Sequence, residues 1–300
     1  APIHIGGTFD PQKSSFKIEE YDSKQNSTGS MEGTIKNGQV EGVWKTADGK
    51  KSFTLSLKES YNMATKFDAY YLEKEYLLFE DEPEFAKAAA SSHFLYPTQT
   101  HDPKQLGGLQ KLLRLQLNET GNKPISQILQ EQMDTYGKEY VNMNMGDQTK
   151  KEVMESEIPY AFNWTVDSYC GVLYNDNHIL SLEMFTSDYT GGVHGNYSSS
   201  YLVADTRTAK QITLNDIFKT NFKAELDAIL VKVAKKDYAD AVDGTPEVTE
   251  NFYVDGAGLH FVYNPYEIAS YAVGQVILNV PFSQIKNLLK PNNPINHLIK

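Results

Sequence analysis

The residues best placed to do chemistry lie in the stretch Asp188-Tyr-Thr-Gly-Gly-Val-His-Gly195. Gly191, Gly192 and Gly195 fall within five positions, and glycine is the residue that tolerates positive φ and close backbone approach. Apolar-patterned runs on both sides indicate that the stretch connects two strands. His194 would lie at the apex of this connection, where an imidazole that titrates near neutrality could act as a base or a ligand.

Two carboxylates close to His194 in the sequence offer an enzymatic hypothesis. Glu183 and Asp188 would form a glycosidase pair if the fold gave them the required separation, and a glycan-acting enzyme would use His194 with either of them. Other chemistries lack their motifs, because no Gly-x-Ser-x-Gly elbow occurs and no metal-binding motif surrounds His194. We therefore expect no catalytic residue, no metal and no cofactor, and a histidine that hydrogen-bonds its loop closed.

A second group of polar and aromatic residues follows the motif Asn264-Pro265, on a predicted loop between strands. A tyrosine combines a large contact face with a hydroxyl, which suits a recognition surface, although a tyrosine also packs well over the end of a sheet. The candidate ligand-binding residues are Asp188, Tyr189, Gly191, Gly192, His194, Tyr266, Glu267 and Tyr271.

Composition limits the class of partner. The net charge of -11 disfavours nucleic acid, whose phosphates attract clustered Lys and Arg, and it favours a basic partner or simply solubility. Cys170 is the only cysteine, so no intrachain disulfide can form, and no apolar run is long enough to span a bilayer. The chain begins at Ala1 without a signal sequence, and we expect a mature chain whose export signal or lipid anchor is out of view.

The 300 residues exceed one typical domain, and turn signals divide them. In residues 1–60, Asn37-Gly38 and Asp48-Gly49 separate short runs, and residues 52–57 alternate strictly between polar and apolar. This pattern predicts a small antiparallel β module over residues 1–60, followed by a domain over residues 61–300.

The second domain mixes strands and helices. Pro124 precedes an apolar stripe of 3.6-residue period, which predicts a helix over residues 124–142, and a capping box at Thr213 predicts another. The tail from Pro291 is expected to pack loosely. The fold class is therefore α+β, an antiparallel sheet with a long helix packed on it, preceded by a small all-β N-terminal meander. Strands are expected over residues 67–79, 85–96, 160–174, 178–187, 196–204 and 275–280, with a hairpin over 252–261 around Asp255-Gly256 and a closing helix over 282–289.

Three motifs in this domain match a known family in order and spacing. They are Asp188–Gly195, then Asp205-Thr-x-Thr-x-Lys210 with Ile212-Thr-Leu-Asn-Asp-Ile-Phe218, then Gly258-Leu-x-Phe-x-Tyr-x-Pro-Tyr-Glu-Ile-Ala-x-Tyr-Ala-x-Gly274. Together they resemble the extracytoplasmic domain of the anti-sigma factor RsiV, which also precedes the catalytic domain of the peptidoglycan deacetylase PdaC. The resemblance covers about residues 100–290, with its sharpest motifs in 180–290, and Val193 replaces the usual alanine.

The resemblance implies a binding role. The RsiV domain binds lysozyme as a signal, whereas in PdaC the chemistry belongs to a separate domain. The resemblance therefore implies a non-catalytic recognition protein outside the cytoplasm, which would be periplasmic, secreted or lipid-anchored. Its partner would be lysozyme, another basic cell-wall-related protein or peptidoglycan. An acidic surface would speed the encounter with basic lysozyme. Two alternatives stay open: the glycan-acting enzyme, and a surface lipoprotein scaffold in which residues 1–60 dock a neighbour.

Overall fold

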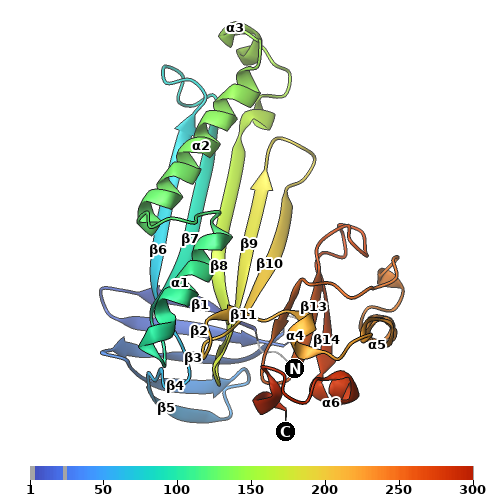
Figure 1. The fold of residues 1–300 in the computed structure, drawn as a ribbon. Helices are drawn as coiled ribbons and strands as arrows, with labels where there is room; N and C mark the ends of the chain where they lie inside the picture. Colours follow the sequence, from blue (N-terminus) through green and yellow to red (C-terminus); the bar gives the residue numbers. More distant parts are fainter. Residues whose placement is uncertain (1–3, 23–25, 300) are drawn as a thin grey trace. The chain divides into compact units, whose positions relative to one another are not determined.

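The structure, a computed structural model, describes residues 4–22 and 26–299 (Figure 1). The chain divides into two compact units, Ala1–Ser60 and Tyr61–Lys300. The expectation of a mixed α/β chain with antiparallel sheets and an all-β N-terminal segment is confirmed. No described helix has the length and apolar character needed to cross a membrane.

The first unit is a five-stranded antiparallel meander in which each strand pairs with the next. At the turn between its third and fourth strands, Asn37 and Gly38 both have positive φ, 50° and 73°, as a tight primed hairpin turn requires. Its strands are β1 (His4–Asp10), β2 (Ser15–Tyr21), β3 (Ser27–Lys36), β4 (Gln39–Thr46) and β5 (Ser52–Lys58).

One face of this meander is apolar, since strand alternation gathers its large side chains. Met31 pairs with Trp44 and Trp44 with Phe53, and the last two rings lie 5.5 Å apart. Phe16 is the buried apolar residue among the described residues of this unit, whereas Phe53 is 59% exposed. The unit therefore has an amphipathic sheet with little covered core.

The second unit is organised around a six-stranded sheet in the order β11-β10-β9-β8-β7-β6. Its neighbours are antiparallel except for β7 and β8, which are parallel because the long connection between them contains three helices and returns the chain to the same end. The strands are β6 (Lys66–Leu77), β7 (Lys87–Gln99), β8 (Trp164–Asp176), β9 (Ile179–Tyr189), β10 (Asn196–Asp205) and β11 (Lys210–Gln211).

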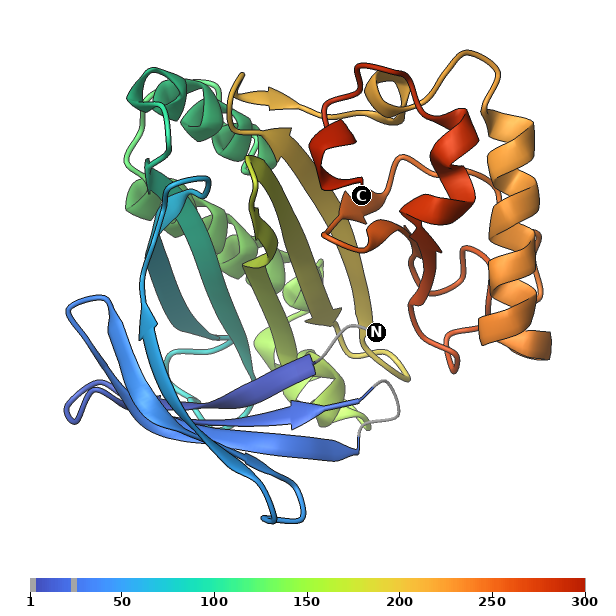
Figure 2. The same ribbon diagram turned by 90° about the horizontal axis from the view of Figure 1, so that it is seen from below.

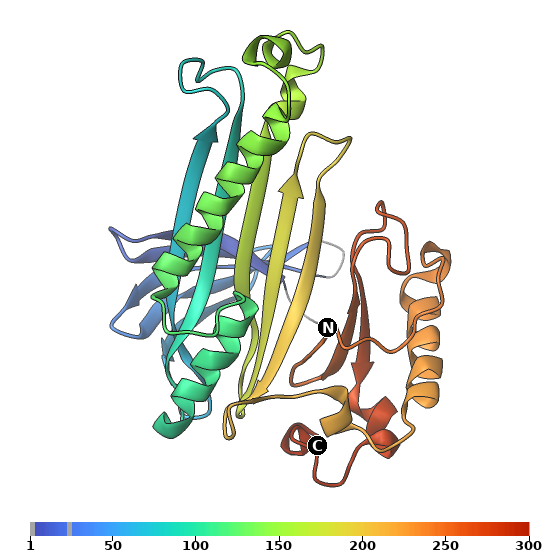
Figure 3. The ribbon, with the colours of Figure 1, turned by 45° about the horizontal axis from the view of Figure 1, so that its top comes forward.

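Helices α1 (Leu106–Gln116) and α2 (Ile125–Met145) cover one face of this sheet, and α2 runs along the strands (Figure 3). Leu109 and Leu129 of these helices share a core with Leu182 of the sheet. The expected start of a helix at Pro124 is confirmed, because α2 begins at the next residue. The long helix does not cover the sheet alone, because α1 precedes it on the same face and the short α3 (Lys150–Met154) follows it.

A C-terminal lobe forms a further layer of sheet and helix beside β10 (Figure 2). Ile179 and Val203, from the sheet face opposite α1 and α2, join the hydrophobic core of this lobe. The lobe consists of α4 (Leu214–Ile217), α5 (Lys223–Asp237), α6 (Phe282–Ile285) and the antiparallel strands β12 (Phe252–Val254), β13 (Gly258–Tyr263) and β14 (Val276–Pro281).

The C-terminal tail is part of the lobe's core. Ile295 is fully buried and Leu298 is buried beside it, and the backbone amide of Lys290 donates to the Ile217 carbonyl at 2.9 Å. The expectation that the chain packs loosely after Pro291 is therefore wrong. Prolines and asparagines shape the tail as turns, while its isoleucines and leucine anchor it.

Candidate functional site

The two loops that contain most of the predicted site residues meet in the structure. One is the β9–β10 connection, residues 190–195, and the other is the β13–β14 connection, residues 264–275. The ring of His194 stacks on Tyr271 with centroids 4.1 Å apart, and the Tyr266 ring lies 6.5 Å away with its plane inclined by 29°. Side chains separated by about seventy residues of sequence thus form one group, which we call the two-loop cluster (His194, Tyr266 and Tyr271).

Hydrogen bonds fix the imidazole within this cluster. His194 Nδ1 lies 2.8 Å from the Gly195 carbonyl, which can only accept, so this nitrogen is the donor. In the neutral ring Nε2 is then the acceptor, and the Tyr266 hydroxyl donates to it at 3.2 Å. The Tyr271 hydroxyl donates to the same Gly195 carbonyl at 2.7 Å. Both ring nitrogens have partners, so His194 ties the two loops together.

Backbone geometry explains the first loop. Gly191 has φ +85°, and a Cβ there would lie 2.1 Å from the Ala161 carbonyl oxygen, so this position needs glycine. At Gly195 a Cβ would lie 2.8 Å from the Asp188 carbonyl oxygen. Gly192 differs, because its nearest neighbour, the His194 carbonyl oxygen, would be 3.8 Å from a Cβ, which leaves room for a side chain.

The second loop is held by polar side chains. The Glu267 carboxylate accepts a hydrogen bond from the backbone N–H of Asn264 at 2.9 Å. This bond closes the turn in which Tyr266 has φ +72°. Asn264 in turn ties the loop to β10, since the Ser199 amide donates to its Oδ1 at 2.8 Å and its Nδ2 donates to the Ser199 carbonyl at 3.2 Å. Glu267 therefore shapes the loop, and Tyr266 is presented outward with 63% of its surface exposed.

Asp188 lies outside the two-loop cluster. Side chains alternate along β9, and Asp188 is an even number of residues from Leu182, which faces the helices. It acts on Tyr136 of α2: burial first, and the negative charge of Asp188 second, raise the pKa of that phenol to about 12. Tyr189, half-buried at the end of β9, lies next to Gly195.

Glu183 lies on the opposite face of β9 from Asp188, so the two carboxylates do not converge as a glycosidase pair. Three hydroxyls donate to Glu183: Ser199 Oγ at 2.6 Å, Tyr201 at 3.1 Å and Tyr169 at 3.1 Å. The structure therefore brings His194 together with Tyr266 and Tyr271, and not with either acid named in the enzymatic hypothesis.

Aromatic residues extend the two-loop cluster onto the sheet. Tyr271 contacts Tyr197 edge-on at 6.0 Å, Tyr197 stacks on Phe185 at 6.1 Å, and Phe185 stacks on Tyr169 at 4.8 Å. We call Tyr197, Phe185 and Tyr169 the aromatic row. Sequence reasoning missed it, although strand alternation in 169–201 places these rings on one face.

The described residues contain no group of three or more His, Cys, Asp or Glu that could hold a metal ion. Cys170 is buried against the helix-covered face, and burial raises the pKa of its thiol to about 11. This thiol is therefore protonated at neutral pH and a poor nucleophile.

Comparison with known proteins identifies two family segments. Residues 110–197 match the deacetylase PdaC family model, and residues 215–283 match the model of a protein of unknown function, DUF3298. The first segment contains His194 and the second contains Tyr266 and Tyr271, so the two-loop cluster joins the two segments. A comparison with curated proteins finds no match.

Solved structures support the same assignment. A DUF3298 family member from Bacteroides fragilis superposes with a TM-score of 0.70 at 25% identity, over 80% of this chain and 99% of that one. A DUF3298 family protein from Pseudomonas aeruginosa shares the fold with a TM-score of 0.50 at 18% identity, over 79% of this chain and 98% of that one. The chain therefore contains a domain of the PdaC and DUF3298 type.

Proposed function

We propose that residues 61–300 form a non-catalytic recognition domain that binds its ligand through the two-loop cluster and the exposed tip beside it. The proposal rests on one observation: a histidine whose hydrogen bonds are all made within the fold lies beside side chains that are exposed to solvent. His194 has partners at both nitrogens, while Tyr266 is mostly exposed and Val193 fully exposed. A tyrosine that is hydrogen-bonded to His194 beside an apolar tip suits binding, since a side chain already held in place loses less entropy on association.

Charge favours a basic ligand. Residues 1–60 contain eight lysines and eight acidic residues, so the net charge of -11 comes entirely from residues 61–300. Such a domain attracts basic proteins over a distance set by the ionic strength. The resemblance to the RsiV domain and the PdaC match support a ligand of the cell envelope, outside the cytoplasm, with lysozyme as the first candidate and peptidoglycan as the second.

The test is calorimetric titration with lysozyme, and separately with soluble peptidoglycan fragments, at low and moderate salt. We expect lysozyme to bind more tightly at low salt and Tyr266→Ala to weaken binding about tenfold, as loss of a buried aromatic anchor does. Tyr71→Ala is the matched control, because Tyr71 is also an exposed tyrosine, at 65%, but lies on β6.

Binding of peptidoglycan fragments alone, with the same loss in Tyr266→Ala, would replace lysozyme by glycan as the ligand. Absence of heat with either ligand at both salt concentrations, or equal effects of the two tyrosine variants, would contradict the proposal. Muropeptide turnover that disappears in His194→Ala would instead establish the enzymatic hypothesis.

A further inference from the structure

A cavity of about 820 Å³ lies at the other end of the β9–β10 hairpin, between the turn after β10 and the C-terminal tail. Its walls come from residues 205–216 and 290–297. This volume lies within the range typical of sites for small molecules. The proposed function does not use this cavity, because the two-loop cluster is at the opposite end of the same hairpin.

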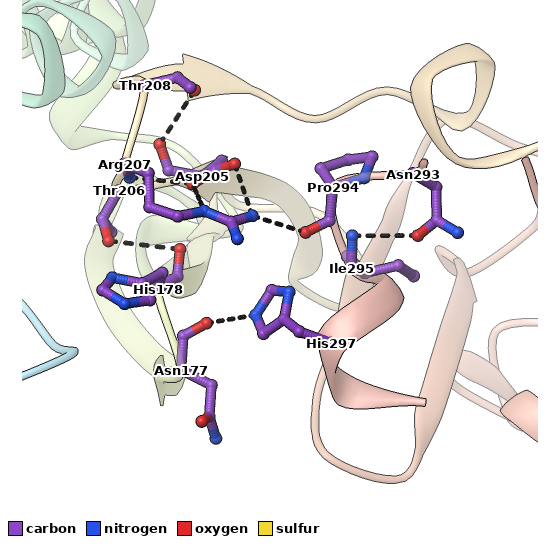
Figure 4. A network of polar contacts seen from close by, with 10 residues as sticks. All are labelled: Asn177, His178, Asp205, Thr206, Arg207, Thr208, Asn293, Pro294, Ile295 and His297. Carbon is purple, nitrogen blue, oxygen red and sulfur yellow. Dashed lines mark hydrogen bonds and ion pairs between the residues drawn. The ribbon is translucent and has the colours of Figure 1, made fainter. Parts of the chain in front are cut away.

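An ion pair builds one wall (Figure 4). Arg207 grips Asp205 with two hydrogen bonds, Nε to Oδ1 at 2.9 Å and Nη2 to Oδ2 at 2.8 Å. The same Nη2 donates to the Pro294 carbonyl at 2.8 Å, which ties the tail to β10. Asp205 is buried, whereas the Arg207 side chain is 40% exposed, so the guanidinium keeps an edge toward the cavity.

Two lysines also line the cavity. Lys290 donates to the Asn215 carbonyl, and Lys210 begins β11. Both lysines are close to Asp216. The pKa of the Asp216 carboxyl is lowered mainly by the hydrogen bond from the Thr213 backbone amide, and the positive charges of Lys290 and Lys210 lower it further. Asp216 is already engaged in a capping box, where it accepts from the Thr213 amide at 2.9 Å and hydroxyl at 2.7 Å.

The charge balance of the cavity is opposite to that of the chain. Three cations, Arg207, Lys210 and Lys290, and two carboxylates line the cavity. Asp205 is paired with Arg207, so Lys210 and Lys290 against Asp216 leave one positive charge. Arg207 is one of only two arginines in this acidic chain. The remaining lining is rich in amide side chains, which donate as well as accept: Gln211, Asn292, Asn293 and Asn296.

Histidines lie beneath this wall. His297 lines the cavity and contacts the Asn177 carbonyl through Nε2, which fixes that nitrogen as a donor. His178 follows Asn177 in the same turn (Figure 4). The rings of His178 and His101 are 4.9 Å apart. The charged side chains that line the cavity therefore sum to one positive charge, and this favours a negatively charged ligand.

We infer that this cavity binds a small anion with carboxylate or phosphate groups, held by Lys210, Lys290 and the open edge of the Arg207 guanidinium. Charge-assisted hydrogen bonds from ammonium and guanidinium groups are the strong contacts that such oxygens make. The amide side chains orient the rest of the ligand.

The test is calorimetry on the full chain with inorganic phosphate and, separately, with succinate, against sodium chloride of equal ionic strength. We expect saturable binding of one or both, and Lys290→Gln and Lys210→Gln each to weaken it about tenfold, as loss of one charge-assisted contact does. Phosphate and succinate distinguish the two oxyanion classes.

Lys219→Gln is the matched control. Lys219 also donates to a backbone carbonyl in the lobe, that of Asn287 at 2.7 Å, but it does not line the cavity. We expect binding in this variant to equal that of the parent. Absence of saturable heat with both anions, or equal weakening in Lys219→Gln and Lys290→Gln, would overturn the inference. Thermal melts without anion establish that all three variants are folded.

Discussion

The two ends of the β9–β10 hairpin use different chemistry. At one end, where Asp188 pairs with Asn196, the loop is glycine-rich and its polar contacts join neutral groups. At the other, where Ile179 pairs with Asp205, an ion pair joins the strand to the C-terminal tail. The nine residue steps between these pairs span roughly 30 Å of extended strand.

The difference shows how one rigid element presents two surfaces. The loop end stays open, because its aromatic residues pack on and hydrogen-bond to one another while the Tyr266 side chain remains exposed to solvent. The strand end is closed by the tail, because a buried carboxylate must keep its cation and that cation holds the tail carbonyl. Variants at the two ends are far enough apart for their effects on stability to add.

The largest expected effect is at the closed end. Asp205→Ala leaves the Arg207 guanidinium, which is partly buried, without its carboxylate. Breaking a buried ion pair costs about 3–5 kcal/mol, and the 40% exposure of the arginine side chain lowers our expectation to about 2–3 kcal/mol of unfolding free energy. Urea denaturation measures it.

The paired variant Asp205→Ala with Arg207→Met should cost less than Asp205→Ala alone, since no unpaired charge is left. A single variant as stable as the parent within about 0.5 kcal/mol would show that the tail is held by its apolar residues and not by the ion pair.

A smaller loss of stability is expected at the open end. Gly191→Ala places a Cβ against the Ala161 carbonyl at a positive φ, and we expect it to cost about 1–3 kcal/mol and to weaken ligand binding. Gly192→Ala, at a roomy position, should stay within about 0.5 kcal/mol of the parent. Equal melting curves for the two alanine variants would remove our account of the glycine loop.

Tyr271→Phe tests the hydrogen bonding of the two-loop cluster more gently. The substitution keeps the stack on His194 and deletes the donor to the Gly195 carbonyl, so we expect a loss of about 0.5–1.5 kcal/mol. The imidazole contact to the same carbonyl should limit the loss. A stability unchanged from the parent would mean that water replaces the hydroxyl.

The smallest expected effect depends on pH and belongs to the closed end. Burial first, then the positive charges of His101, Arg207 and His297, lower the pKa of His178. The unfolded state therefore binds a proton near pH 6.5 while the folded state stays neutral, so stability falls as pH drops below about 6.5. We expect a loss of less than about 1 kcal/mol between pH 7.5 and 5.5, reduced in His178→Gln. A pH response identical in that variant would assign the effect to other groups.

The features of the fold and site that could be predicted from the sequence are those that neighbouring residues determine. The glycine loop, the Asn37-Gly38 turn and the helix start after Pro124 are set by neighbouring residues, and each was predicted. The contact between His194 and Tyr266 depends on how the lobe packs on the sheet, so the sequence could place both residues on loops without showing that they meet.

The cationic cavity was missed for the same reason. Lys210 and Lys290 come from segments eighty residues apart, and the proline- and asparagine-rich tail looked loose because its two buried anchors, Ile295 and Leu298, are isolated in polar sequence. The rarity of arginine was a signal that could have pointed to Arg207. The parallel pairing of β7 and β8 depends on the long helical connection between them. Sequence reasoning expected no helix over residues 106–116, although Leu106, Leu109 and Leu113 have helical spacing.

Hydrogen exchange measured with and without saturating lysozyme tests the central claim most directly, because it locates the ligand on the chain. The account predicts slower exchange in residues 190–195 and 264–275, with the turn after β10 and the C-terminal tail unchanged. Protection elsewhere in the chain, with both loops exchanging as in the free protein, would contradict it.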